Sequence, residues 1–228
     1  MEGKYVLVTG GSSGLGFEIA KKLLAKGAHV TICSRSEENL KKAATNLNSP
    51  NLSTIVCDVT NYSAVESMMS KMQQLDVVIN TAGMFLEGNL ESFTPERITE
   101  TVQVNLIGTI FTTKAALPLL KQSQNAFIVN VSSTSGLKGR PNETIYCASK
   151  WGVQGFTESL KLDLVNTNIR VVGFYPGGMN TPFFEKANSV RPTETYMNPA
   201  DVAEIVAYIL QEPSNLSIDH IVVNKRAV

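Results

Sequence analysis

Seven short apolar runs alternate with amphipathic segments along the chain, and this alternation constrains the fold more than any other feature. The runs occupy residues 5–8, 30–32, 54–56, 77–79, 127–129, 171–174 and 221–223. Each run is continuous rather than alternating with polar residues, as in parallel strands that are covered on both faces. The sequence therefore predicts an α/β fold, a doubly wound sheet of about seven parallel strands with helices on both sides.

We expect one domain spanning residues 1–228, because no linker, internal repeat or break in composition divides the chain. Residues 84–93 and 182–198 show no regular pattern and contain Gly, Pro or Asn. Both segments follow predicted strands. In an open parallel sheet the ligand crevice lies beyond the carboxyl ends of the strands. We therefore expect these segments to enclose a substrate, with a short lid around residues 182–198.

Charge and cysteine content argue against several classes of function. The 20 Lys and Arg residues balance 20 Asp and Glu residues, which disfavours a general nucleic-acid binder. No apolar stretch approaches the roughly 18 residues of a membrane span. The first residues lead directly into a strand-like run, so we expect no signal peptide. The three cysteines and two histidines lack ligand spacing, which predicts reduced thiols, no metal site and a cytoplasmic protein.

A glycine-rich turn follows the first predicted strand. Residues 9–16 read Thr-Gly-Gly-Ser-Ser-Gly-Leu-Gly, and a helical pattern comes next. Glycine lets the backbone turn sharply and approach a ligand closely, and the start of a helix attracts phosphate. Between a strand and a helix, such a turn indicates a dinucleotide site. A nucleoside triphosphate site is disfavoured because the turn lacks a Gly-Lys-Ser/Thr ending.

The second predicted strand ends near Cys33 and is followed by Ser34 and Arg35, with no carboxylate before Glu37. Dinucleotide sites that prefer NAD usually place an acidic residue here to bind the ribose 2′-hydroxyl, whereas an arginine accommodates a 2′-phosphate. The sequence therefore predicts that NADP(H) is preferred, with NAD(H) as the alternative. The competing interpretation is that Arg35 is only a solvated residue at the start of a helix.

Tyr146 and Lys150 lie four residues apart in a predicted helix, so their side chains share one face. The fifth predicted strand ends at Ser132 and Ser133, whose hydroxyls would project toward the same crevice. A free tyrosine has a pKa of about 10 and is a poor base near neutral pH, but a neighbouring ammonium stabilises its phenolate. The spacing is common on helices by chance, so its meaning depends on the other motifs.

With these motifs in this order, the chain resembles the short-chain dehydrogenase/reductase family, in the branch with a TGxxxGxG cofactor loop and a YxxxK active site. The resemblance covers nearly the whole chain and implies a Rossmann fold. It is carried by residues 9–16 as the cofactor loop, Asp58 as the adenine contact, residues 80–83 as the NNAG segment with Thr81 as a departure, Asn105 as the helix asparagine, and residues 176–181 as the PGxxxT segment.

The resemblance implies hydride transfer between C4 of a nicotinamide and the carbon of a carbonyl or secondary alcohol. It implies that Tyr146 is the general acid in reduction and the general base in oxidation. Lys150 would lower the tyrosine pKa and bind the nicotinamide ribose. Ser133, which fits the spacing better than Ser132, would hold the substrate oxygen, and Asn105 would position a helix bulge and a water.

The cofactor-binding residues predicted in this way are Gly10, Ser12, Ser13, Gly14, Leu15, Gly16, Ser34, Arg35, Asp58, Val59, Asn80, Ala82, Gly83, Tyr146, Lys150, Pro176, Gly177, Met179 and Thr181. Taken singly, several of them have a purely structural alternative. Asn105 could bend a helix, Asp58 could form an Asx turn, and Asn80 and Gly83 could simply end a strand. Taken together, the structural alternative requires many coincidences in the right order.

Three further expectations concern the substrate and partners. Phe183, Phe184 and Tyr196 fit an apolar, modest-sized carbonyl substrate, and equally fit a lid that docks on the core through aromatic rings. The resemblance implies a homodimer, or a tetramer, that pairs through residues 94–121 and 144–165. The tail after residue 223 lacks the glycine common in the family, which puts contacts of a tail-dependent tetramer in doubt.

Two rival functions remain. The first is a non-catalytic NADP-binding sensor or scaffold, because a fold does not determine a function. A sensor has no physical need for the complete set of Asn105, Ser133, Tyr146 and Lys150. The second is an extended sugar-nucleotide epimerase, which the length of the chain and the spacing of its glycines disfavour.

Overall fold

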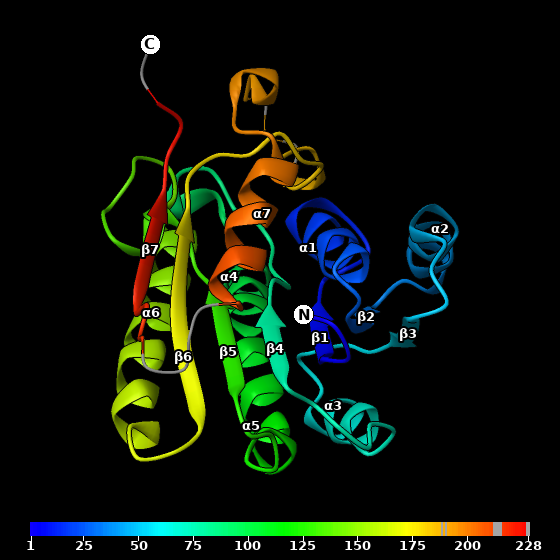
Figure 1. The fold of residues 1–228 in the computed structure, drawn as a ribbon. Helices are drawn as coiled ribbons and strands as arrows, with labels where there is room; N and C mark the ends of the chain where they lie inside the picture. The colour runs from blue at the N-terminus through cyan, green and yellow to red at the C-terminus, as the bar shows by residue number, and fades with distance from the viewer. Residues whose placement is uncertain (188, 190, 212–215, 227–228) are drawn as a thin grey trace.

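The structure is a computed structural model that describes residues 1–187, 189, 191–211 and 216–226. These residues form a seven-stranded sheet in which every neighbouring pair is parallel, in the order β3-β2-β1-β4-β5-β6-β7 (Figure 1). The strands are β1 (Tyr5–Thr9), β2 (His29–Ser34), β3 (Leu52–Val56), β4 (Val77–Asn80), β5 (Ala126–Val131), β6 (Ile169–Pro176) and β7 (His220–Val223). The doubly wound parallel sheet is therefore confirmed.

Helices cover both faces of this sheet (Figure 1). Helices α1, α2 and α7 pack on one face, and α3, α5 and α6 pack on the other. Their bounds are α1 (Gly14–Ala25), α2 (Glu37–Leu47), α3 (Tyr62–Met69), α4 (Pro95–Val102), α5 (Gly108–Leu120), α6 (Thr144–Leu164) and α7 (Pro199–Ile209). No helix among the described residues is long and apolar enough to cross a membrane.

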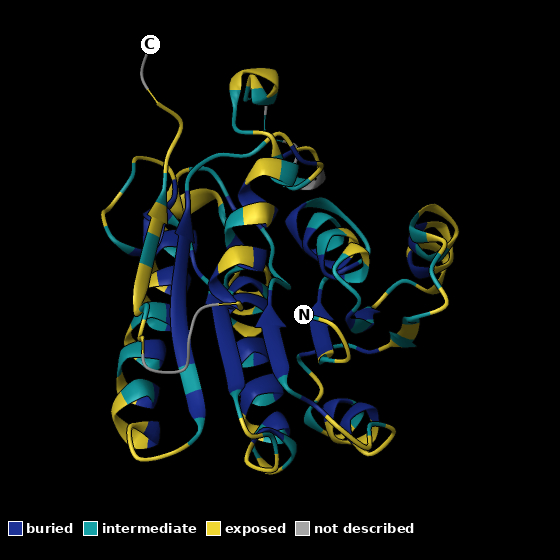
Figure 2. Cartoon of the chain, in the orientation of Figure 1, coloured by how far each residue is buried: buried dark blue, intermediate teal, exposed yellow. Residues whose placement is uncertain are grey.

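The continuous apolar character of the strands follows from burial on both faces. Along β1, Val6 and Val8 face the core beneath α1 and α7, whereas Leu7 between them faces the core beneath α3 and α5. Leu7 and Val8 have no exposed surface. Figure 2 shows the central strands as the buried centre of the molecule. Burying such a side chain stabilises the fold by about 1.5–3 kcal/mol, so the sheet is held rigidly enough to position the loops at its ends.

The expected long helix over residues 94–121 is interrupted by one widened turn. The Thr94 hydroxyl caps the start of α4, and Pro95 occupies its first position, where a missing N–H costs nothing. A π-helical turn, η2 (Gln103–Ile107), then separates α4 from α5. Such turns insert an extra residue into a helix and occur frequently at functional sites. Asn105 lies in this turn, as the resemblance implied.

The two irregular segments lie beyond the carboxyl ends of β4 and β6, as predicted. They contain three short 3-10 turns, η1 (Leu90–Ser92), η4 (Glu185–Ala187) and η5 (Thr193–Thr195). A parallel bridge joins Met179, just before the second segment, to Met197 near its end. Within the expected lid, residues 188 and 190 lie outside the described part of the chain.

Candidate active site

A cavity of about 730 Å³ opens at the carboxyl ends of the strands. Its volume suits a small-molecule or cofactor site. Nearly all predicted site residues contribute to its lining, from segments far apart in the sequence: Gly10, Ser12, Ser13, Gly14, Leu15, Gly16, Ser34, Arg35, Asp58, Val59, Ala82, Gly83, Ser133, Tyr146, Lys150, Pro176, Gly177, Met179 and Thr181. Two predicted residues, Asn80 and Asn105, are absent from this lining.

The glycine-rich turn is held close to the backbone that follows β4. Gly10 has φ +67°, and a Cβ there would lie 2.9 Å from the Cα of Ala82. A Cβ at Gly16 would lie 2.4 Å from Oγ1 of Thr81. Oγ1 of Thr9 accepts hydrogen bonds from the N–H groups of Thr81 and Ala82, at 3.2 and 3.1 Å. Only glycine fits these positions, and this tight turn aims the start of α1 into the cavity.

The start of α1 suits a pyrophosphate. Its first turn carries no acidic residue, and its backbone N–H groups give this end of the helix a partial positive charge. Gly14 and Gly16 in this turn leave the backbone accessible to a ligand. The residues present therefore fit the phosphates of a dinucleotide.

Arg35 lines the cavity with two residues of α4 that the sequence analysis missed. Nη1 of Arg35 lies 3.9 Å from the Glu100 carboxylate, and Nη1 of Arg97 lies 2.7 Å from the same carboxylate. All three side chains are at least one-third exposed, so these ion pairs contribute little to stability. Their importance is local, because they place two guanidiniums on either side of one carboxylate in the cavity lining.

Asp58 makes the Asx turn considered for it and also lines the cavity. Its carboxylate accepts the backbone N–H of Thr60 at 2.9 Å and the Thr60 hydroxyl at 2.8 Å, which makes an Asx turn. It also lines the cavity beside Val59. The turn holds the carboxylate at the rim, where an adenine contact is sterically feasible.

Asn80 requires a correction. It is buried, and its side-chain amide donates to Oγ1 of Thr113 at 3.0 Å and to Oδ1 of Asn130 at 2.9 Å. These partners belong to α5 and β5, so the side chain joins a strand to a helix on the face away from the cavity. Its predicted contact with the cofactor is not supported by this position.

Asn105 shapes the cavity without lining it. Its side chain exchanges two hydrogen bonds with the backbone of Met84, and it donates to the Ser149 hydroxyl at 2.9 Å. Asn105 is completely buried. The π-helical turn therefore ties together the loop after β4 and the helix that carries Tyr146.

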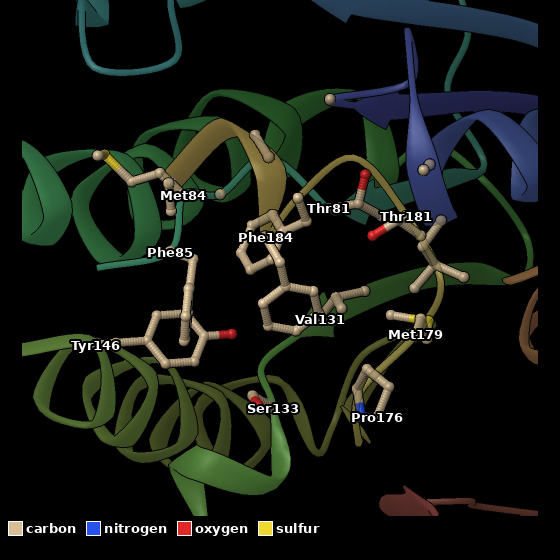
Figure 3. Close-up of a pocket in the computed structure, with 18 of the residues that line it drawn as sticks. Thr81, Met84, Phe85, Val131, Ser133, Tyr146, Pro176, Met179, Thr181 and Phe184 are labelled. Carbon is tan, nitrogen blue, oxygen red and sulfur yellow. The ribbon is translucent and has the colours of Figure 1, made fainter. Parts of the chain in front are cut away.

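Tyr146, Ser133 and Lys150 meet inside the cavity. Figure 3 shows the Tyr146 hydroxyl pointing into it, with Val131 and Ser133 on that side and Phe85 across the ring. The hydroxyls of Ser133 and Tyr146 both lie on this side of the cavity. Nζ of Lys150 donates to the carbonyl of Val131 at 3.0 Å and lies 5.9 Å from the centre of the tyrosine ring. The structure therefore brings these three predicted residues together in one cavity.

Ser132 has a structural role, in agreement with its poorer fit to the motif. Its hydroxyl donates to the backbone carbonyl of Lys150 at 2.9 Å. A Cβ at Gly136 would lie 2.4 Å from that same hydroxyl. This contact fixes the distance between α6 and the segment after β5.

Burial dominates the electrostatics of the site. Tyr146 is only 6% exposed, and burial raises the pKa of its hydroxyl above the ordinary value, against a smaller lowering by the nearby Ser133 hydroxyl. Burial likewise lowers the pKa of Lys150 to about 8. The amine of Lys150 is directed to the Val131 carbonyl, and its lowering of the tyrosine pKa stays a prediction.

The sequence analysis also missed Phe85, which lines the cavity beside Tyr146. Phe85, Tyr146 and Phe184 form a buried aromatic cluster, with Phe183 and Tyr196 packed against it. The ring of Phe85 meets that of Tyr146 edge to face, with centroids 4.9 Å apart.

Beside these rings lies an ion cluster of Glu87, Glu143 and Arg191. Nη2 of Arg191 lies 2.7 Å from a carboxylate oxygen of each glutamate. The three residues come from separate loops and share no motif, so the sequence carries no signal for their contact.

Comparison with known proteins identifies the family. The family model described as short chain dehydrogenase matches residues 4–192. The chain belongs to this family. It is therefore an oxidoreductase of the short-chain dehydrogenase type, with the fold that the family resemblance predicted.

The chain is similar along its whole length to other members. It is 32% identical over 225 residues to an uncharacterised oxidoreductase of Staphylococcus aureus (strain MW2), covering 96% of each chain. Among solved structures, an alcohol dehydrogenase from Thermococcus sibiricus in complex with 5-hydroxy-NADP is 25% identical, with a TM-score of 0.89 and full coverage of both chains. The actinorhodin polyketide ketoreductase with NADPH is 30% identical, with a TM-score of 0.89 and 98% of each chain covered.

Proposed function

We propose that this protein uses NADP(H) to interconvert a carbonyl compound and a secondary alcohol, with Tyr146 as the general acid and base. The observation that carries this proposal is the position of the Tyr146 hydroxyl. It lies beside Ser133 in the same cavity that the glycine-rich turn lines. A proton donor and a dinucleotide site thus share one water-poor space, which is the arrangement that hydride transfer to a carbonyl requires.

Each side chain has a defined task in this scheme. A bound nicotinamide supplies the hydride donor or acceptor. The Ser133 hydroxyl holds the substrate oxygen, and Tyr146 gives that oxygen its proton during reduction. Because burial raises the pKa of Tyr146, the hydroxyl stays protonated at neutral pH and is ready to act as the acid. Buried Lys150 places a positive charge near the tyrosine ring, which favours the phenolate left after proton transfer.

The preference for NADP(H) is supported by the position of Arg35 in the cavity lining. Arg35 follows β2 at the place where an arginine accommodates a 2′-phosphate. The alcohol dehydrogenase structure above contains 5-hydroxy-NADP, and the ketoreductase structure contains NADPH. NAD(H) is the alternative cofactor.

Turnover separates this proposal from the rival function of a non-catalytic NADP-binding sensor or scaffold. NADPH oxidation is followed by its absorbance against a panel of ketones, aldehydes and quinones. The proposal expects turnover on at least one carbonyl compound. Tight NADPH binding without turnover on any member of the panel would favour the sensor.

We further propose a cytoplasmic homodimer. The thiols of Cys33, Cys57 and Cys147 are free and buried, as suits a reducing compartment. Along α6, the apolar side chains of Leu162 and Val165 are largely exposed, so a second copy of the chain could cover them. Light scattering after size-exclusion chromatography tests this, and Leu162→Glu is expected to shift the dimer toward monomer.

A further inference from the structure

Glu143 is a buried carboxylate that the proposed chemistry leaves unused. Its side chain is 3% exposed and lies one helical turn before Tyr146, at the start of α6. The Ser135 hydroxyl donates to one carboxylate oxygen at 2.7 Å, and Nη2 of Arg191 donates to the other at 2.7 Å. An ionised carboxylate so deeply buried requires such partners, because desolvation alone would make it very unfavourable.

Arg191 connects this carboxylate to the opposite wall of the cavity. Its guanidinium makes a two-pronged contact with Glu87, in which Nη2 and Nε lie 2.7 and 3.1 Å from Oε1. The same guanidinium lies 4.9 Å from the centre of the Phe85 ring, and that ring packs directly on Tyr146. Arg191 therefore contacts two neighbours of Tyr146, which are Glu143 on its own helix and Phe85 against its ring.

The charges around Tyr146 come from three parts of the chain. On its own helix lie Glu143, the Cys147 thiol and Lys150. After β5 lies Ser133, on the side to which the tyrosine hydroxyl points. From the irregular segments come Arg191 and, beyond it, Glu87. Glu143 and Cys147 raise the pKa of Tyr146, whereas Arg191 lowers it.

We propose that Glu143 and Arg191 are positioning residues for Tyr146, an opposed charge pair that sets the electrostatic field at its hydroxyl and holds residues 191–197 against α6. This inference rests on the proposed function of Tyr146. It makes a distinctive claim, because the two partners of one ion pair act on the tyrosine with opposite signs. Removing Arg191 leaves Glu143 without its ion-pair partner, whereas removing the charge of Glu143 leaves Arg191 paired with Glu87 alone.

The test is the pH dependence of kcat/KM for alcohol oxidation with saturating NADP+, where Tyr146 must be deprotonated. Glu143→Gln keeps the shape and removes the negative charge, so its apparent pKa is expected to fall by about 1. Arg191→Met leaves Glu143 uncompensated, so its apparent pKa is expected to rise by about 1. The double variant is expected to return close to the wild-type value, and Arg191→Lys should restore most of the shift.

A second measurement covers variants that lose activity. Tyrosines labelled with ¹³C at Cζ report ionisation by NMR in the NADP+ complex, and Tyr146→Phe identifies the signal of Tyr146. Glu204→Gln is the matched control, because Glu204 pairs with Lys22 and Lys26 on the α1–α7 surface, away from the cavity lining. It is expected to leave both the pH profile and the NMR titration unchanged.

The possible outcomes separate this inference from the proposed function. If Tyr146→Phe retains activity, the proposed function itself is wrong. If Tyr146→Phe abolishes activity but Glu143→Gln and Arg191→Met shift the profile in the same direction, or not at all, only the inference is overturned. Opposite shifts with recovery in the double variant support it.

Discussion

The side chain of Asn105 exchanges two hydrogen bonds with the backbone of Met84: it accepts the N–H at 2.8 Å and donates to the carbonyl at 3.0 Å. Met84 follows Gly83 in the loop after β4, and Gly83 lines the cavity. The Asn105 side chain, which the π-helical turn carries, thus makes the two backbone hydrogen bonds that a neighbouring strand would otherwise make to this loop. In this way a helix irregularity positions one wall of the candidate active site.

Asn105→Ala is therefore expected to reduce both stability and activity. It leaves the partly buried N–H of Met84 without its partner, and the Ser149 hydroxyl loses a donor. The expected cost is about 2–4 kcal/mol in the free energy of unfolding, measured by urea denaturation. We expect kcat/KM to fall more than about tenfold as the wall shifts. An unchanged unfolding free energy would contradict this account of the loop.

Asn80→Ala provides the contrast. The variant also loses two buried hydrogen bonds, to Thr113 and Asn130, so a comparable loss of stability is expected. Because the side chain lies away from the cavity, the Kd for NADPH should stay within about twofold of wild type at a temperature where the variant is folded. A selective loss of NADPH affinity would instead show that Asn80 contacts the cofactor, as the sequence predicted.

The framework of this site could be read from the sequence because local rules determine it. The tight turn at Gly10 and Gly16 needs residues without a Cβ, and four-residue spacing places Tyr146 and Lys150 on one helix face. Continuous apolar runs similarly predict strands buried on both sides. Each of these inferences uses residues that are neighbours in the sequence.

Contacts between distant loops could not be predicted in this way. Arg191 meets Glu87 across 104 positions and Glu143 across 48, without any periodic pattern that would announce the contact. The approach of Glu100 to Arg35 likewise depends on the sheet order, which brings α4 opposite the end of β2. For Tyr146, helix spacing predicts that Lys150 is near but not that burial raises the pKa of the tyrosine hydroxyl.

Cofactor preference is expected to depend on Arg35 and its neighbour Glu100. Arg35→Ala should raise the Kd for NADPH by about tenfold or more and leave the Kd for NADH nearly unchanged, because only NADPH carries the 2′-phosphate. Glu100→Gln removes a negative charge near that phosphate, so it should tighten NADPH binding by a few-fold. Fluorescence titration measures both constants. Equal changes for the two cofactors in Arg35→Ala would refute the phosphate role.

Lys150 is expected to reduce stability at neutral pH. Its folded-state pKa is about 8, below the value of about 10.4 in an unfolded chain. Between these values the unfolded state binds more protons, so this lysine makes stability rise with pH over that range. Below pH 8 the full penalty of the buried charge is present. Lys150→Met should therefore be inactive yet more stable at pH 7, by about 2 kcal/mol.

Urea denaturation of both proteins at several pH values checks this prediction. The difference in unfolding free energy between Lys150→Met and wild type should shrink as pH rises from about 8 to about 10.5. A difference that stays constant with pH would show that the lysine is not buried with a lowered pKa.

The central claim is that the Tyr146 hydroxyl moves the proton in a reaction carried out beside a bound nicotinamide. Its most direct test is Tyr146→Phe, which removes one oxygen and keeps the ring that packs on Phe85. For a carbonyl substrate that the wild-type protein reduces, kcat should fall by about 10²–10⁴-fold, while the Kd for NADPH stays within about twofold. If Tyr146→Phe reduces that substrate at a rate near wild type, the tyrosine is not the proton donor and the account is wrong.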